Sequence, residues 1–208
     1  VLMSAFLLLS AFSCGGGNKA NSTSEQNEET VVNVPQFDAD SAYLYVKNQV
    51  DFGPRVPNTK EHVACGNYLA GQLEAFGAQV TNQYADLIAY DGTLLKARNI
   101  IGSYKPESKK RIALFAHWDT RPWADNDPDE KNHKTPILGA NDGASGVGAL
   151  LEIARLVNQQ QPELGIDIIL LDAEDYGAPQ FYTGKHKEEF WCLGSQYWAR
   201  NPHVQGYN

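Results

Sequence analysis

The pattern of apolar and polar positions predicts two helices in the first half of the chain. In "DADSAYLYVKNQVDFGPR", apolar residues recur at helical spacing after Asp40 or Ser41, either of which can cap a helix, and Gly53 ends it. A second and stronger helix is predicted in "NTKEHVACGNYLAGQLEAFGA", capped by Asn58 or Thr59. Its apolar side is expected to consist of Val63, Tyr68, Leu69, Leu73 and Phe76.

The pattern then changes to strands. "QVTNQYADLIAY" and "TLLKARNIIGSY" flank a turn at Asp91 and Gly92, which predicts two strands joined by a hairpin or a short excursion. "RIALFAHW" is a near-continuous apolar run, as expected for a strand covered on both faces, and "GIDIILLDAED" predicts another.

A helix is predicted between these two apolar strands, in "DGASGVGALLEIARLVNQQ", and "LGSQYWARNP" predicts the start of a further one. A strand, a crossover helix and a second strand imply parallel neighbours with a right-handed connection. The predicted fold is therefore α/β, with a mostly parallel central sheet and helices on both faces. The apolar side of the crossover helix is expected to consist of Leu150, Leu151, Ile153, Ala154, Leu156 and Val157.

The N-terminal residues are not expected to belong to this fold. Residues 1–14 form an apolar run that ends in Cys14, too short to span a bilayer but typical of the apolar region of a secretory signal. The run resembles a bacterial lipoprotein signal, in which the cysteine is acylated, and simple signal cleavage nearby is the alternative. Residues 15–36 are predicted to be a flexible polar tether, and residues 37–208 a catalytic domain. We therefore expect an exported protein, periplasmic or anchored to a membrane.

Composition and charge narrow the possible partners. The chain has 208 residues, 42% of them hydrophobic and 20% charged, which predicts one globular domain. The formal net charge of −8 gives no general attraction to nucleic acid, which we do not expect as a partner. In an oxidising compartment, Cys65 and Cys192 could form a disulfide, but two separate buried thiols are at least as consistent with their aromatic surroundings.

Candidate chemistry gathers where the predicted strands end. His117 and Asp119 follow one apolar strand, Glu174 and Asp175 follow the other, and Asp142 lies where a loop meets the crossover helix. Taken singly, each has an ordinary explanation as a cap, a structural histidine or a solvated charge. Together they would meet at one edge of the sheet, where several carboxylates repel and need a cation. Imidazole with carboxylate oxygen suits zinc.

Three segments in this order, "AHWDT", "GANDGASGVGALLEIAR" and "LLDAEDYG", resemble the zinc-binding segments of the M28 family of metallopeptidases. The resemblance covers residues 40–208 and is greatest to the glutaminyl cyclase branch of Bacteroidetes type. It implies that Asp142 and Asp175 bind zinc and that Glu174 is a general acid and base. It also implies that His117 holds a second zinc in the aminopeptidases and that Asp119 orients the site. One zinc ion is implied for a cyclase and two for an aminopeptidase.

An inserted segment favours the cyclase over the peptidase. In the family's aminopeptidases, the helix that begins with "GS" follows almost directly after the acidic pair, which is Glu174 and Asp175 in this chain. Here the segment "YGAPQFYTGKHKEEFWCL" lies between the two. Its aromatic residues could line a small dry pocket, or could simply hold a surface loop in place: Tyr176, Phe181, Tyr182, Phe190 and Trp191.

The resemblance implies conversion of N-terminal glutamine of peptides or proteins to pyroglutamate, with release of ammonia. One alternative is an M28-type zinc aminopeptidase, and a second is a non-catalytic, anchored binding module. The family also uses zinc ligands from later strands, and His186 and His203 lie in the wrong segments to replace them. We therefore expect the sequence to be a fragment that lacks its C-terminal part.

Overall fold

The computed structural model of the chain describes residues 33–207, and a compact unit begins at Pro35. The predicted signal at 1–14, with Cys14, and most of the predicted tether lie outside the described residues. Among the helices of the described part, none is long and apolar enough to cross a membrane. In chain order the helices and strands are α1 (Ala39–Val50), α2 (Lys60–Ala75), β1 (Gln79–Ile88), β2 (Leu94–Tyr104), β3 (Arg111–His117), α3 (Ser145–Gln159), β4 (Gly165–Leu171) and α4 (Leu193–Arg200).

The first two helices begin at capping side chains. The carboxylate of Asp38, and not Asp40 or Ser41 as predicted, caps α1, because it accepts the N–H groups of both later residues. Thr59 caps α2 as predicted. The apolar side of α2 is shifted from the expected one, since Val63 is 56% exposed.

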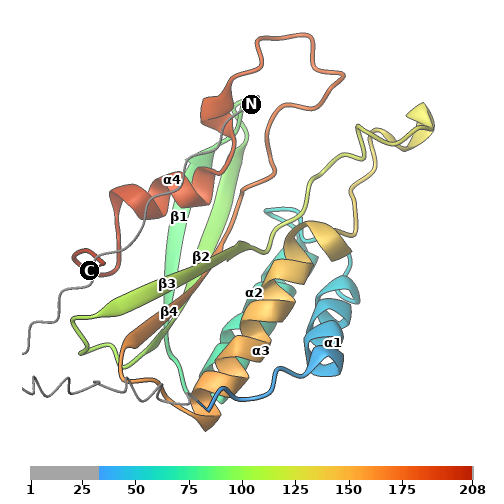
Figure 1. Ribbon diagram of the computed structural model, residues 1–208. Helices are drawn as coiled ribbons and strands as arrows, with labels where there is room; N and C mark the ends of the chain where they lie inside the picture. The colour runs from blue at the N-terminus through green and yellow to red at the C-terminus, as the bar shows by residue number, and fades with distance from the viewer. Residues whose placement is uncertain (1–32, 208) are drawn as a thin grey trace, which may run out of the picture. The chain divides into compact units, whose positions relative to one another are not determined.

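The sheet has the order β1-β2-β4-β3 (Figure 1). β1 and β2 form the predicted antiparallel hairpin, and β3 and β4 are the predicted parallel neighbours joined through α3. β2 and β4 are antiparallel, however, so the sheet is mixed in the described part of the chain. The α/β class is confirmed, and the expectation of a mostly parallel sheet is corrected.

Helices cover both faces of the sheet. α2 and α3 pack on one face, α1 packs on α3, and α4 lies against the opposite face (Figure 1). The side chains of β4 alternate between two apolar clusters, so this strand is buried along its whole length. Ile168 and Leu170 join the cluster with α2 and α3, whereas Ile169 and Leu171 join the cluster that includes Trp198 of α4.

β3 is less covered than its apolar sequence predicts. It is the last strand in the order and pairs with β4 alone among the described strands. Ile112 is therefore 45% exposed and Phe115 46% exposed. The sequence could not distinguish a central strand from an edge strand here, because both are rich in apolar residues.

Candidate metal centre

The ends of two neighbouring strands form the base of the candidate site. His117, the last residue of β3, pairs with Leu171, the last residue of β4. One residue further on, the N–H of Trp118 donates to the carbonyl of Leu171 at 3.0 Å. The two chains therefore stay together beyond the strands, and the residues that follow them share one edge of the sheet, as predicted.

Asp119 connects the segments that follow the two strands. Its fully buried carboxylate accepts the N–H of Glu174 at 3.1 Å through Oδ1 and the N–H of Asp175 at 3.2 Å through Oδ2. Both oxygens are thus bound to the backbone of the acidic pair. Asp119 fixes the direction in which Glu174 and Asp175 leave the strand.

A third segment brings Asp142 to the same place. The turn Ala140–Ala144 precedes α3 and contains Gly143, with a φ of +90°. A Cβ on Gly143 would lie 2.9 Å from the carbonyl oxygen of Asp119 and 3.3 Å from Cε1 of His117. Only glycine lets the turn approach β3 this closely without a shift, and the approach places Asp142 beside His117.

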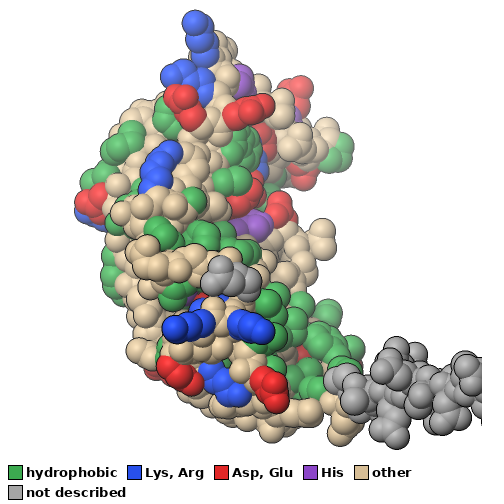
Figure 2. Space-filling view, turned by 60° about the vertical axis from the view of Figure 1, so that its left-hand side comes forward, with side chains coloured by type: hydrophobic (Ala, Val, Ile, Leu, Met, Phe, Trp, Pro, Cys, Tyr) green, Lys and Arg blue, Asp and Glu red, His purple; other side chains and the backbone are tan. Residues whose placement is uncertain are grey.

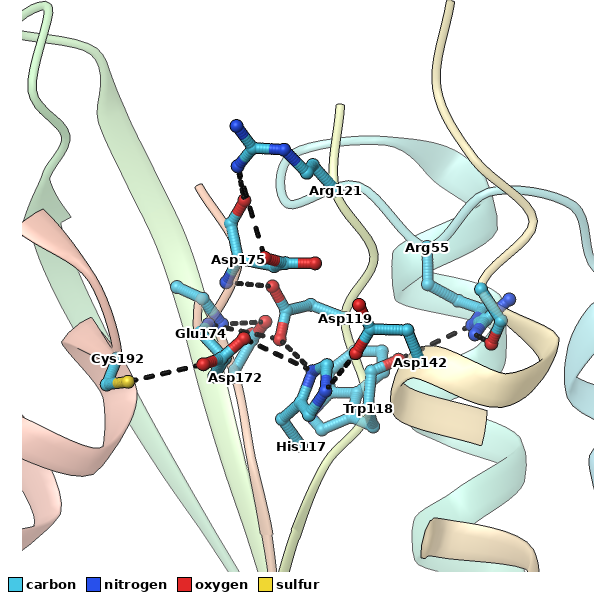
Figure 3. A network of polar contacts seen from close by, with 12 residues as sticks. Arg55, His117, Trp118, Asp119, Arg121, Asp142, Asp172, Glu174, Asp175 and Cys192 are labelled. Atoms are coloured by element: carbon cyan, nitrogen blue, oxygen red, sulfur yellow. Dashed lines mark hydrogen bonds and ion pairs between the residues drawn. The ribbon is translucent and has the colours of Figure 1, made fainter. Parts of the chain in front are cut away.

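His117 lies at the centre of the acidic residues (Figure 3). Its Nε2 is 3.0 Å from Oδ1 of Asp142, and its Nδ1 is 3.5 Å from Oδ1 of Asp119 and 3.9 Å from Oε2 of Glu174. In a view of one face of the molecule, a histidine side chain lies among acidic ones near the middle (Figure 2). The structure therefore brings together the five residues that the sequence singled out.

The clustered charges change the ionisation of two of these side chains. Burial raises the pKa of Asp175 to about 7, and the carboxylates of Asp142, Glu174 and Asp119 add to the shift. Burial by itself lowers the pKa of His117, but Asp119, Glu174 and Asp142 outweigh it and raise that pKa to about 9. The local field is strongly negative, which favours a bound cation.

The residues present fit a zinc ion by type and by unmet hydrogen-bonding capacity. Nδ1 of His117 and Oδ2 of Asp175 are buried without a hydrogen-bond partner. A nitrogen and several carboxylate oxygens are common zinc donors. Within residues 33–207, no three such side chains already have their donor atoms gathered around one point. The donor atoms are therefore near one another, but they are not arranged around one common position.

Two buried residues behind the site were not singled out from the sequence. His62 of α2 contacts the carboxylate of Asp172, and Arg55 donates to the carbonyls of Trp118, Leu138 and Gly139. Both lie in segments that the pattern assigned to a helix or its end. The only signal in the sequence was that Arg55 and His62 stand next to apolar residues. Charged and polar residues on the surface of a helix show the same pattern, so the signal did not indicate that these two are buried.

Arg121 holds the inserted segment against the site. Its guanidinium binds both oxygens of Asp125, at 2.7 and 2.6 Å, and donates to the carbonyl of Asp175 at 3.1 Å. It also lies 4.8 Å from the ring centre of Trp191 and 5.5 Å from that of Trp123. The buried guanidinium of Arg121 thus connects the inserted segment to the acidic pair, through Trp191 and the carbonyl of Asp175.

A cavity of about 260 Å³ opens beside Asp142. Its lining residues come from the segment 121–127, with Ile137 and Asp142, and include Trp123. The five aromatic residues of the insertion are not among them, which favours the alternative that they hold a surface loop in place. Instead, Tyr176 and Phe181 pack edge-on against Trp123 from behind, with ring centres 5.3 and 6.5 Å away.

The remaining candidates lie apart from one another. Cys65 and Cys192 are both free thiols, and Cys65 is buried in the core with α2 and α3. The thiol of Cys192 donates to Oε1 of Glu174 at 3.3 Å. As expected, His186 and His203 do not join the site, since they contact Tyr182 and Trp198 instead.

The family described as peptidase family M28 matches residues 99–208 of this chain. The matched range begins in β2 and includes His117, Asp119, Asp142, Glu174 and Asp175.

Solved structures are similar over most of the described chain. The glutaminyl cyclase of Bacteroides thetaiotaomicron bound to N-acetylhistamine is 95% identical with a TM-score of 0.83, over 85% of this chain and 60% of that one. A leucine aminopeptidase precursor from Bacteroides thetaiotaomicron is 95% identical with a TM-score of 0.84, over 86% and 61%. The glutaminyl cyclase of Tannerella forsythia is 58% identical with a TM-score of 0.80, over 84% and 60%. This chain therefore spans about 60% of the length of these structures.

Proposed function

Because the chain belongs to peptidase family M28, we propose that it carries much of the active site of a zinc-dependent glutaminyl cyclase. Such an enzyme converts an N-terminal glutamine of a peptide or protein to pyroglutamate and releases ammonia. The observation that carries the proposal is the convergence of three chain segments, through His117, Asp142 and Glu174, at one edge of the sheet. The likeness to two glutaminyl cyclases supports the choice of reaction.

Asp142 and Asp175 are the proposed zinc ligands, with His117 as a further ligand if two ions bind. The unpartnered Oδ2 of Asp175 and Nδ1 of His117 support this assignment. When bound, zinc polarises a carbonyl group as a Lewis acid. Asp119 keeps these donors in place by holding the backbone of the acidic pair.

Glu174 is the proposed acid and base. Its side chain is 30% exposed, so a substrate amine can reach it, and the Cys192 thiol holds one of its oxygens. The carboxylate would take a proton from the attacking α-amine and return it to the leaving side-chain nitrogen. Trp123 and the aromatic residues behind it would limit the access of water, which would otherwise give glutamate.

An aminopeptidase is the second candidate function. The likeness to a leucine aminopeptidase precursor favours it, and its residues would be the same. Glu174 would then activate a water molecule against the first peptide bond. The inserted segment 176–193 favours the cyclase, and its Tyr176 and Trp191 pack on Trp123 and Arg121 beside the acidic pair.

Mass spectrometry of peptides separates these functions. The full-length protein is incubated with zinc and with peptides that begin with glutamine or leucine. Loss of ammonia from the glutamine peptide, abolished by chelator and by Glu174→Gln, is expected. Release of free leucine would instead indicate an aminopeptidase. Glu189→Gln, at a side chain that is 63% exposed, is the matched control and should keep full activity.

We further propose export and lipid attachment at Cys14, which rests on the apolar residues before it. Labelling of the expressed protein with a radioactive fatty acid tests this proposal. The wild type should carry the label in the membrane fraction, and Cys14→Ser should not. Label-free protein in the soluble fraction would favour simple signal cleavage.

A further inference from the structure

A buried histidine and aspartate lie directly behind the candidate metal centre. Nε2 of His62 is 3.0 Å from Oδ1 and 2.8 Å from Oδ2 of Asp172. The side chain of His62 is 4% exposed and that of Asp172 is fully buried. Neither touches the groups proposed to react, so the chemistry does not explain why this pair is present.

Asp172 controls the backbone of the turn that carries the acidic pair. Its Oδ1 accepts the N–H of Ala173 at 2.7 Å, and its Oδ2 accepts the N–H of Arg98 at 2.6 Å. Its own N–H donates to the side chain of Asn99 at 2.9 Å. Ala173 has a φ of +51°, in the left-handed region that non-glycine residues rarely adopt. The turn is strained immediately before Glu174 and needs these contacts to persist.

His62 also contacts the segment that follows β3. Its ring stacks on Trp118, with the ring centres 4.3 Å apart and an angle of 15° between the planes. Trp118 lies between His117 and Asp119, is fully buried, and donates its indole N–H to the carbonyl of Arg98 at 3.1 Å. One side chain of α2 therefore supports both strand ends that carry the site.

We propose that His62 is a positioning residue, which holds the segments after β3 and β4 in the relative placement that the site requires. Through Asp172 it fixes the strained turn before Glu174, and through Trp118 it fixes the backbone between His117 and Asp119. The effect on turnover rests on the proposed function, whereas the effect on the turn does not. Losing His62 would leave the carboxyl group of Asp172 buried without this hydrogen-bond partner, and the turn would relax.

The test compares two substitutions of His62 with a control in the same helix. His62→Leu removes the ring nitrogens, whereas His62→Gln keeps a side-chain N–H donor. Leu73→Ala is the control, because Leu73 is fully buried in α2 and belongs to the core cluster rather than to the site. It reports the effect of lost stability alone.

The first readout is hydrogen exchange of the N–H groups of Glu174 and Asp175, which both donate to Asp119. Exchange is expressed relative to the N–H of Ile168 in β4, so that a general loss of stability cancels. His62→Leu is expected to accelerate this relative exchange about tenfold or more. His62→Gln should accelerate it less, and Leu73→Ala should leave it unchanged.

The second readout is turnover and zinc affinity. We expect His62→Leu to lower kcat and zinc affinity about 10–100-fold with little change in KM, as for supporting residues of metal sites. If His62→Leu leaves relative exchange unchanged, or if Leu73→Ala changes it equally, the positioning role is overturned. If the wild type cyclises no peptide, the proposed function fails, and the exchange comparison still decides the role of His62.

Discussion

At the level of single residues, Gly143 determines how closely the turn of Asp142 approaches the end of β3. Gly143→Ala would force a Cβ to within 2.9 Å of the Asp119 carbonyl oxygen, at a φ of +90°. We expect a loss of about 1–3 kcal/mol in the free energy of unfolding, measured in urea, together with weaker zinc binding.

Gly71 offers the matched control for this substitution. It lies in the exposed part of α2, where an added Cβ would meet nothing within 4 Å. Gly71→Ala should therefore raise the free energy of unfolding by about 0.5–1 kcal/mol, because alanine favours a helix more than glycine does. Equal effects of the two substitutions would contradict the steric argument.

Single residues also show what sequence reasoning can and cannot find. His117 and Asp175 could be predicted as neighbours because each follows an apolar strand, and strand ends share an edge. His62 could not, because its position in α2 looks like any polar position of an amphipathic helix. The role proposed for His62 depends on its contact with Asp172, which is 110 residues away and shortly precedes Glu174 and Asp175. Only the packing of α2 on the sheet brings them together.

At the level of elements, the cap of α2 supports the same region. Oγ1 of Thr59 accepts the N–H of His62 at 3.2 Å, so the cap and the buried histidine share the first turn. Thr59→Ala should lower the free energy of unfolding by about 1 kcal/mol, measured by thermal or urea unfolding. Thr59→Ser keeps the acceptor and should be close to wild type. A loss as large in Thr59→Ser would argue against the hydrogen bond as the cause.

The strands show a second limit of prediction at this level. The hairpin of β1 and β2 follows from a local turn, and the parallel pair β3 and β4 follows from the helix between them. The pairing of β2 with β4 has no local signal, because some 60 residues of other structure separate the two strands. That pairing makes the sheet mixed and places β3 at the end of the order.

Arg121 connects the inserted segment to the element that carries the acidic pair. Arg121→Lys keeps the charge but loses the two-pronged contact with Asp125, which should cost about 1.5–3 kcal/mol. The segment should then loosen, and trypsin should cut faster at Lys185 and Lys187. Arg155→Lys is the control, because Arg155 makes a similar pair with Glu152 on α3. Equal cleavage in both variants would contradict the role of Arg121.

At the level of the whole molecule, the carboxylate of Asp175 should destabilise the folded protein without metal and stabilise it when zinc is bound. Its carboxylate is 10% exposed, its Oδ2 has no hydrogen-bond partner, and three other carboxylates surround it. A carboxyl group whose pKa is raised by folding destabilises the folded state once the pH exceeds its unfolded value, and this cost is complete above the raised pKa of about 7. At pH 8 without metal, the folded protein carries that full cost.

Asp175→Asn removes the charge with little change in shape. In chelator at pH 8, the variant should therefore have a higher Tm than the wild type. With zinc at about 10,000 times its Kd the order should reverse, because an ion that binds only the folded state then adds about 5.5 kcal/mol, and the variant loses a ligand. This gain exceeds the roughly 4 kcal/mol that corresponds to raising the pKa of Asp175 from 3.8 to about 7. Asp86→Asn, at a side chain that is 60% exposed and pairs with Lys96, should change Tm by the same small amount in chelator and in zinc. The same order of Tm values in chelator and in zinc would show that Asp175 does not bind the ion, since repulsion among carboxylates alone cannot reverse with metal.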